Sequence, residues 1–233
     1  MRTLGLLGGM SWESTVTYYQ VINRRIAAEL GGLHSARLLL YSLDFGELEI
    51  MQREDRWDDM AARLCDAASA LERAGAELLV ICTNTMHKVA PRLEASSAIP
   101  LLHIIDPTGE AIIAAGHKKV GLLGTRFTME QDFYRGRLEG FGVDVLVPGE
   151  SSRARVHDII YSELCLGVIS ESSRASLVEV VSALVGAGAE AVVMGCTEVG
   201  LLLRPSDVSV PLFDTTVLHA EAAALASLGS RPL

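Results

Sequence analysis

The stretch AGAELLVICTNT (residues 74–85) decides the fold of this chain. It passes from a glycine through four consecutive apolar residues, LLVI, to Cys82 and three small polar residues. A continuous apolar run of this length is typical of a strand that is buried on both faces of a parallel sheet. Taken alone, Cys82 is more often a core residue than a reactive one, because free cysteine packs as a small hydrophobe.

The same pattern occurs a second time. The stretch AGAEAVVMGCTE (187–198) repeats it, so that Cys196 stands 114 residues after Cys82 at the equivalent position. Two further pairs of segments repeat in the same order: GLLGGM (5–10) with GLLGTR (121–126), and IPLL (99–102) with VPLF (210–213). Solenoid repeats are far shorter than this period, so the sequence predicts one duplicated unit rather than an array.

Amphipathic stretches separate most of the apolar runs, and residues 57–75 and 172–188 are examples of them. Buried strands that alternate with amphipathic helices predict the α/β class, with parallel sheets flanked by helices. Ligands of such sheets bind beyond the carboxyl ends of the strands, where both cysteines are expected. If the two units face each other, both thiols point into one cleft between them.

The composition excludes several classes of function. Hydrophobic residues make up 49% of the chain and charged residues 21%, which is typical of a compact soluble protein. A net charge of −9 argues against nucleic acid or an anionic membrane as a partner, since both select basic surfaces. No apolar segment approaches the roughly 18–20 residues of a membrane span, and no secretory cleavage site follows the N-terminus. We therefore expect a cytoplasmic protein with reduced cysteines.

A pair of opposed thiols suits inversion of configuration at a carbon atom. One thiolate removes a proton from one face of the carbon, and the opposite thiol delivers a proton to the other face. An unperturbed thiol has a pKa of about 8.5, so one cysteine needs help to ionise, and the N-terminus of a following helix supplies it. The polar side chains that follow each cysteine, Thr-Asn-Thr after Cys82 and Thr-Glu after Cys196, can orient each sulfur and bind the polar groups of a substrate.

The chain resembles the aspartate/glutamate racemase family, the PLP-independent amino-acid racemases, and most nearly its broad-specificity bacterial branch. The resemblance spans nearly the whole chain and rests on GLLGGMSWEST (5–15), CTNTMHK (82–88), LLGTRFTMEQDFYRGRL (122–138) and GCTEVGLL (195–202). It implies two pseudo-symmetric Rossmann-like domains with the active site in the cleft between them. The implied domains are residues 1–98 plus 210–233, with Cys82, and residues 99–209, with Cys196. It also implies a homodimer that acts on a small amino-acid substrate.

The resemblance implies a role for particular residues. Cys82 and Cys196 match the acid/base pair that interconverts the L and D enantiomers. The matching substrate-binding residues are Met10, Gln52, Thr83, Asn84, Thr85, Thr125, Thr197 and Glu198. Strict aspartate racemases hold the second carboxylate with an arginine and a lysine, but those positions fall here at Gln52, with Arg53 adjacent, and near Leu166. We therefore expect that aspartate and glutamate are not the sole substrates.

No cofactor and no metal is expected. A PLP enzyme needs a lysine for its Schiff base, and of the three lysines only Lys88 lies near a cysteine motif, without a phosphate cup around it. The glycines match neither nucleotide-binding pattern, and the cysteines lack zinc spacing. Cys65 and Cys165 are expected to be core residues. Two interpretations of His87 stay open: it is a base behind the thiol, or it is a residue of the helix surface.

Other functions stay open at this level. Maleate isomerases and hydantoin racemases also use two cysteines, and arylmalonate decarboxylation needs only one. A non-catalytic amino-acid-binding module also has two α/β lobes around a cleft, although binding a zwitterion does not call for two thiols. Thiol–disulfide exchange is disfavoured because the cysteines are not in CxxC spacing.

Overall fold

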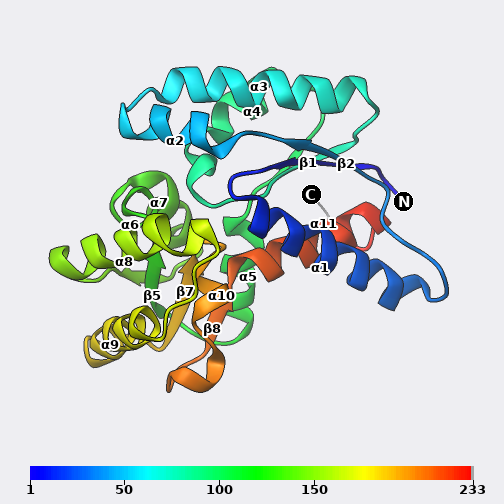
Figure 1. Ribbon diagram of the computed structural model, residues 1–233. Helices are drawn as coiled ribbons and strands as arrows, with labels where there is room; N and C mark the ends of the chain where they lie inside the picture. The colour runs from blue at the N-terminus through cyan, green and yellow to red at the C-terminus, as the bar shows by residue number, and fades with distance from the viewer. Residues whose placement is uncertain (232–233) are drawn as a thin grey trace. The chain divides into compact units, whose positions relative to one another are not determined.

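The fold is described from a computed structural model, which covers residues 1–231 (Figure 1). It divides into two compact units, one formed by residues 1–104 with the segment from His219 onward, the other by residues 105–218. The elements before residue 105 are β1 (Leu4–Gly8), α1 (Trp12–Leu30), β2 (Leu38–Ser42), α2 (Phe45–Arg53), α3 (Trp57–Arg73), β3 (Leu78–Ile81), the 3₁₀ helix η1 (Thr85–Val89), α4 (Ala90–Ser96) and β4 (Leu101–Leu102).

The second half of the chain has the same kind of order. Its elements are α5 (Ile105–Ala114), β5 (Lys119–Gly124), α6 (Arg126–Glu130), α7 (Asp132–Glu139), β6 (Asp144–Leu146), α8 (Glu150–Ser162), η2 (Leu164–Leu166), α9 (Glu171–Gly186), β7 (Ala191–Gly195), α10 (Val199–Leu202), η3 (Pro205–Asp207), β8 (Leu212–Asp214) and α11 (Thr215–Leu228). The two stretches predicted as amphipathic helices correspond to α3 and α9.

Each unit contains one four-stranded sheet, and all strand pairs in both sheets are parallel. The strand orders are β2-β1-β3-β4 and β6-β5-β7-β8, so β1 to β4 correspond one by one to β5 to β8. The predicted α/β class with two parallel sheets is confirmed. The correspondence of the strands also agrees with the repeats in the sequence, since β3 and β7 are the strands that lead into Cys82 and Cys196.

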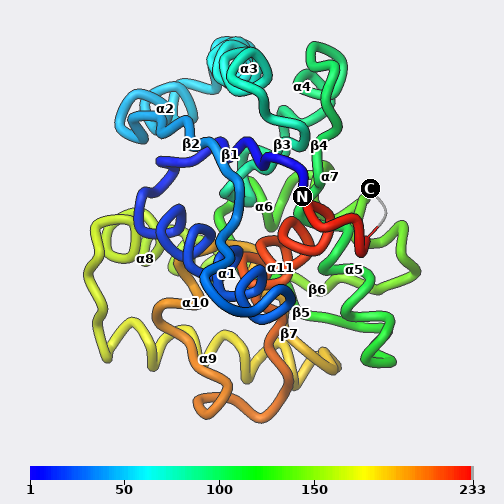
Figure 2. The backbone as a smooth tube through the Cα atoms, turned by 90° about the vertical axis from the view of Figure 1, so that its right-hand side faces the viewer, coloured from blue at the N-terminus to red at the C-terminus, as the bar shows by residue number. Residues whose placement is uncertain are grey.

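Helices cover both faces of the first sheet. On one face, residues of α1 and α11 pack with Leu4, Leu6, Leu78 and Val80 of the strands, and Cys82 belongs to the same buried cluster. On the other face, residues of α2, α3 and α4 pack with alternate strand residues. Figure 2 shows α3 and α4 on one side of these strands, and α1 with α11 on the other. Alternation along β3 therefore assigns the Cys82 side chain to the α1 face.

The second sheet has its main core against α8 and α9, whose apolar residues pack with Leu123, Val192 and Met194. Cys196 belongs to this cluster. On the opposite side, α5 contacts β8 and α7 contacts β6. Each cysteine therefore directly follows a strand whose side chains are buried in a hydrophobic core.

The boundaries between the units follow the pairing of the last strand of each sheet. The short strand β4 pairs with β3 in the first sheet, whereas β8 pairs with β7 in the second. The chain accordingly passes between the compact units near Ile105 and within α11, at His219. The implied division at residues 98 and 209 places each of these strands in the other unit. That division into folding domains stays a prediction. Strand pairing places both passages of the chain between the units after the last strand of each repeat, β4 and β8.

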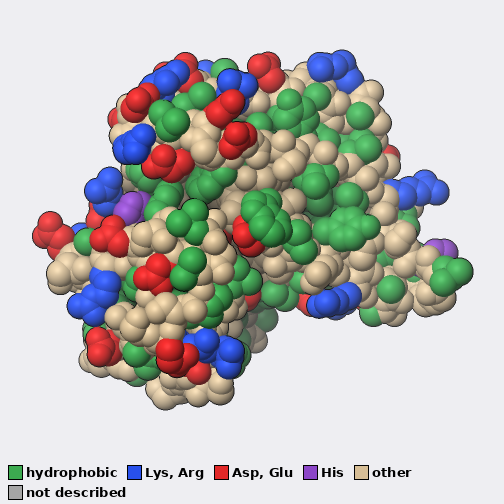
Figure 3. Space-filling model, viewed as in Figure 1, with side chains coloured by type: hydrophobic (Ala, Val, Ile, Leu, Met, Phe, Trp, Pro, Cys, Tyr) green, Lys and Arg blue, Asp and Glu red, His purple; other side chains and the backbone are tan. Residues whose placement is uncertain are grey.

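The exposed face of α1 in the first unit is apolar over two turns. Trp12, Val16 and Tyr19 follow helical spacing and expose 63%, 44% and 53% of their surface. Figure 3 shows hydrophobic side chains gathered over this helix. Among the helices of residues 1–231, none combines the length and the apolar character that crossing a membrane requires.

Candidate active site

Cys82 directly follows β3 and is fully buried. Its backbone N–H donates to the carbonyl of Leu7 over 2.9 Å, which extends the pairing of β3 with β1 by one residue. The thiol has only a long contact, 3.9 Å, with the carbonyl of Val80. Burial raises the pKa of the Cys82 thiol far above its usual value, because the anion loses its hydration. The thiol is therefore neutral in the free protein.

The polar residues after Cys82 are also buried. Thr83, Asn84 and Thr85 expose 9%, 1% and 5% of their surface, and Thr85 begins η1. Three polar side chains are thus buried together in the turn that follows the strand. Gln52, in α2, is brought to the same motif: its Nε2 donates to the sulfur of Met86 over 3.3 Å.

The loop after β1 is tightly held. Gly9 N–H donates to Thr15 Oγ1 over 2.8 Å, and that hydroxyl donates to the carbonyl of Ser11 over 3.0 Å. Gly9 has φ of +84°, and a Cβ there would overlap the backbone of Leu43. Glycine is therefore required at this turn. Met10 follows it and is buried in the core on the α3 side of the sheet.

Cys196 directly follows β7 and exposes 6% of its surface. Its thiol donates to Glu198 Oε2 over 3.0 Å, and Thr197 Oγ1 donates to the same carboxylate oxygen over 2.7 Å. Glu198 itself is almost fully buried. Burial, and then the charge of Glu198, raise the pKa of the Cys196 thiol well above its usual value. This thiol is also neutral, but it has a carboxylate within hydrogen-bond distance.

Thr125 directly follows β5, the strand that corresponds to β1. It is buried, and its Oγ1 caps α6 by accepting from the N–H of Thr128 over 3.3 Å. Leu166, by contrast, exposes 70% of its surface, on the short helix η2. The predicted residues thus divide between the units, with Met10, Gln52 and 82–85 in the first and Thr125 with 196–198 in the second. Within the first unit, Met10 and Cys82 belong to different core clusters, on opposite faces of the sheet.

Two residues near Cys196 were not identified as site residues from the sequence. Tyr134, in α7, is fully buried, and its pKa is raised by burial and, to a smaller extent, by the proximity of the ionisable Cys196. Cys165, in η2, packs against the core cluster that contains Cys196 and contributes to the raised pKa of the Cys196 thiol. Tyr134 lies within a segment that carries the family resemblance, whereas nothing in the local sequence distinguishes Cys165 from a core residue.

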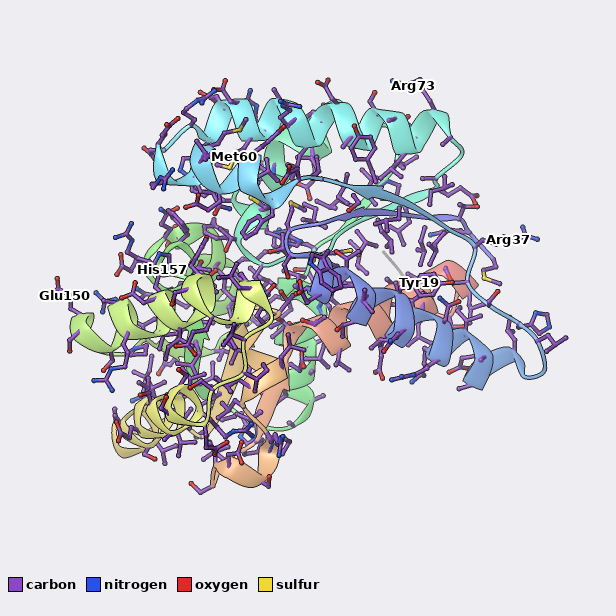
Figure 4. The ribbon with its side chains drawn as sticks, in the orientation of Figure 1. Tyr19, Arg37, Met60, Arg73, Glu150 and His157 are labelled. Carbon is purple, nitrogen blue, oxygen red and sulfur yellow. The ribbon has the colours of Figure 1, made fainter. Side chains whose placement is uncertain are left out.

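A polar pocket of about 350 Å³ lies elsewhere in the second unit, against α6 and α8. Its lining residues are Arg126, Glu130, Glu150, Arg153, Ala154, His157 and Asp158. Figure 4 shows Glu150 and His157 on α8. His157 Nδ1 accepts from the N–H of Arg126 over 3.2 Å, and its pKa is lowered by burial and by Arg126. Hydrogen bonding to Arg126 connects α8 to the residue that follows Thr125.

Among residues 1–231, no cluster of three or more histidine, cysteine, aspartate and glutamate side chains is arranged to hold a metal ion. Each of the four cysteines lies within the described residues, and no disulfide joins any two of them.

The fold and these sites define a duplicated α/β protein with one buried Cys-Thr strand end in each half. Comparison with known proteins gives the family. The profile of the Asp/Glu/hydantoin racemase family matches residues 7–223, and the chain belongs to that family. The predicted resemblance is confirmed, and with it the class of enzyme, a racemase among the isomerases.

Individual relatives cover the chain almost completely. A crystal structure from Yersinia pestis, of a protein provisionally assigned as an Asp/Glu racemase, is 53% identical, covers 98% of this chain and 100% of its own, and superposes with a TM-score of 0.90. An aspartate racemase homologue from Pyrococcus horikoshii is 34% identical over 98% of this chain and 100% of its own, with a TM-score of 0.82. The broad specificity amino-acid racemase RacX of Bacillus subtilis is 22% identical over 94% of this chain and 95% of its own.

Proposed function

We propose that this enzyme interconverts the L and D enantiomers of amino acids by proton transfer between two thiols, Cys82 and Cys196. The observation that carries the proposal is the equivalent position of the two cysteines. Each is buried and directly follows the third strand of its repeat, in sheets of identical strand order. The mechanism requires both sulfur atoms to reach one substrate carbon from opposite faces.

Ionisation of the first thiol is assigned to Glu198. The Cys196 proton passes along the 3.0 Å hydrogen bond to Glu198 Oε2, which leaves a thiolate and a neutral carboxylic acid. The net charge of the buried site does not change, so the step avoids the desolvation penalty of expelling a proton to bulk water. The Thr197 hydroxyl orients the accepting oxygen. The ammonium group of a bound amino acid then stabilises the thiolate by charge.

The racemisation step balances in protons. The Cys196 thiolate removes the proton from the substrate Cα and becomes a thiol, while Cys82 donates its own proton to the opposite face and becomes a thiolate. The reverse reaction exchanges these two roles. A neutral Cys82, as its burial dictates, is the state that can act as the acid in the first direction.

The residues around Cys82 support a proposal for the substrate class. Gln52 is a neutral amide that is buried and bonded to Met86, and Thr83, Asn84 and Thr85 are neutral as well. These residues can bind the ammonium and carboxylate groups that all amino acids share, but they offer no positive charge to a second carboxylate. We therefore propose a broad range of substrates that includes neutral amino acids. The similarity to the broad specificity racemase RacX supports this range.

The proposal also includes the domain division, a homodimer, a cytoplasmic location and a reaction without a cofactor. The apolar face of α1 supports the homodimer, because Trp12 and Tyr19 are more than half exposed on it. Its test is the mass of the protein in solution.

The proposed function is tested with single enantiomers in deuterium oxide. Purified, reduced protein is incubated with a panel of L and D amino acids, while chiral chromatography follows inversion and proton NMR follows loss of the Cα–H signal. Inversion accompanied by deuterium incorporation is expected for several neutral amino acids. Binding without either signal would instead favour the amino-acid-binding module. Cys82→Ser and Cys196→Ser are each expected to lower kcat at least 1,000-fold, on the order of the loss when an acid/base group is removed.

A further inference from the structure

His87 lies five residues after Cys82, in η1, and both of its ring nitrogens are hydrogen-bonded within the first unit. Its Nδ1 is 2.8 Å from the carbonyl oxygen of Thr83, and its Nε2 is 3.1 Å from the backbone N of Ile104. The side chain exposes only 1% of its surface. The ring therefore joins the turn that carries Cys82 to the segment that follows β4.

The two partners fix the tautomer of His87. A carbonyl oxygen can only accept, so Nδ1 carries a proton and donates it to Thr83. The N–H of Ile104 can only donate, so Nε2 has a free lone pair. The ring is neutral in this arrangement, since a second proton on Nε2 would oppose the Ile104 N–H. Only this one tautomer of the ring satisfies both hydrogen bonds.

The ring is also packed among other buried histidines of the first unit. The ring centroid of His103 lies 4.5 Å from that of His87, and that of His219 lies 5.8 Å away. His219 is fixed in turn: its Nε2 donates to the carbonyl of Leu102, and its Nδ1 accepts from the Tyr18 hydroxyl over 2.8 Å. These three histidines and Tyr18 make up one buried layer. The hydrogen bond between Tyr18 and His219 does not involve a residue of the Cys82 turn.

The second repeat has no counterpart of His87. Leu201 stands five residues after Cys196 and is 39% exposed. Conversely, Asn84 of the first repeat occupies the position of Glu198 in the second. The two halves have therefore diverged around their cysteines: the second thiol has a carboxylate partner, and the first has a turn that is held by an imidazole.

We propose that His87 is a positioning residue, which holds the backbone of Thr83, and through it the Cys82 sulfur, in the geometry that proton transfer requires. The inference rests on the proposed function of Cys82. A thiol without a strong hydrogen-bond partner has little to define its position except its own backbone, and small misplacements of a reacting group are costly in rate. Holding the Thr83 carbonyl fixes the peptide group between Thr83 and Asn84, which is one residue beyond the Cα that carries the thiol.

Three variants separate the two bonds. His87→Leu removes both, His87→Asn retains a donor near the position of Nδ1, and His87→Gln retains an acceptor near that of Nε2. We expect His87→Leu to lower kcat about 10- to 100-fold for both enantiomers with KM changed less, as for a misplaced reacting group. His87→Asn is expected to recover part of the loss. Tyr18→Phe is the matched control: it breaks a hydrogen bond in the same buried layer and should keep kcat within about twofold.

Two readouts do not depend on racemisation. Nitrogen-15 NMR of the wild-type imidazoles is expected to show His87 as the neutral Nδ1–H tautomer. The rate of iodoacetamide labelling at Cys82, measured by peptide mass spectrometry, is expected to rise about tenfold in His87→Leu relative to labelling at Cys196, because the turn loosens. If the wild type racemises nothing, the proposed function fails while these two measurements still decide whether His87 holds the Cys82 turn.

The inference is overturned if the nitrogen-15 NMR spectrum of the wild-type protein shows His87 as the Nε2–H tautomer or as the charged form. This measurement does not depend on the folding of any variant. The inference is also overturned if the folded His87→Leu or His87→Gln protein keeps the wild-type kcat. An equal loss of kcat in Tyr18→Phe and His87→Leu would show that any defect of the buried layer lowers activity, and would likewise refute a specific role for His87.

Discussion

Glu198 Oε2 lies 3.0 Å from Cys196 Sγ and 2.7 Å from Thr197 Oγ1, so one carboxylate oxygen accepts from two side chains in a single strand-end turn. All three side chains are nearly inaccessible to water. A buried carboxylate next to a thiol disfavours the free thiolate, yet it is the group able to receive the thiol proton. This arrangement gives Cys196 a chemistry that Cys82 does not share, and it leads to the first prediction.

Glu198→Gln should make racemisation depend on external base. The amide can accept the thiol hydrogen bond but cannot take the proton, so we expect kcat/KM at pH 7 to fall about 100-fold, within the usual range for a lost acid/base group. Activity of the variant should rise with pH, up to about tenfold per pH unit, because hydroxide then ionises a thiol whose pKa burial has raised. Rate measurements between pH 6 and 10 check this.

The control for this prediction is Thr197→Val, which removes the other donor to the same oxygen and keeps the carboxylate. It should lower kcat/KM about threefold, the order of one neutral hydrogen bond, and leave the shape of the pH profile unchanged. A Glu198→Gln enzyme with the wild-type profile would exclude Glu198 as the proton acceptor.

Stability should fall in alkaline solution because of the buried thiols. The pKa of Cys82 is raised in the folded state by burial, so above about pH 9 the unfolded chain loses this proton and the folded protein keeps it. The contribution is fully favourable below the unfolded pKa and is lost as pH rises, by up to about 1.4 kcal/mol per pH unit for each such thiol. Urea unfolding between pH 7 and 10.5 measures the slope.

Cys82→Ala should reduce the slope of the free energy of unfolding against pH by the contribution of one thiol. Val80→Ala is the matched control, since Val80 is equally buried on the same strand and has no ionisable group. It should shift the free energy of unfolding by a constant amount at every pH. A slope that is the same in both variants would show that Cys82 ionises normally in the folded protein.

Gln52→Arg should favour acidic substrates. The amide of Gln52 reaches the sulfur of Met86, four residues after Cys82, so a guanidinium at this position would bring a positive charge to the motif. We expect the ratio of kcat/KM for aspartate to that for alanine to rise at least tenfold, as for one charge-assisted hydrogen bond of about 1.5 kcal/mol or more. Competition assays with both substrates measure the ratio.

Arg53 supplies the control for specificity, because it is adjacent in sequence and exposed. Arg53→Gln should leave the ratio for aspartate and alanine unchanged. If instead Arg53→Gln lowered aspartate turnover while Gln52→Arg changed nothing, Arg53 and not position 52 would be the residue that reads the substrate side chain.

Gly9→Ala should destabilise the first unit strongly. The residue has φ of +84°, and its added Cβ would overlap the backbone of Leu43 beside the β1 end. We expect a loss of about 3 kcal/mol or more, since backbone strain and overlap act together. Gly75→Ala is the control, with φ of +98° and open space around its Cβ, and should cost about 1 kcal/mol. Urea midpoints compare them; equal losses would mean that overlap at Gly9 is relieved.

The repeats and apolar runs of the sequence were sufficient to predict two α/β units with parallel sheets. They also located Cys82 and Cys196 at strand ends, because strand burial is a local pattern that neighbouring residues display. The family followed from short motifs around those ends. The roles of the site residues stay predictions, although the structure shows Thr83, Asn84, Thr197 and Glu198 buried in the turns that contain the cysteines.

Tertiary structure alone decided which groups meet. His87 had no resolved role in the sequence, because its partner Ile104 is 17 residues away and reaches it only since β4 lies beside β3. The same sheet order decided that β4 and β8 each complete the repeat that precedes them. The hydrogen bond from Cys196 to Glu198 depends on side-chain rotamers that no periodicity records. Local pattern thus determined where the thiols stand, and the rotamers of one short turn gave Cys196 its carboxylate partner. Packing between distant segments fixed the turn that follows Cys82.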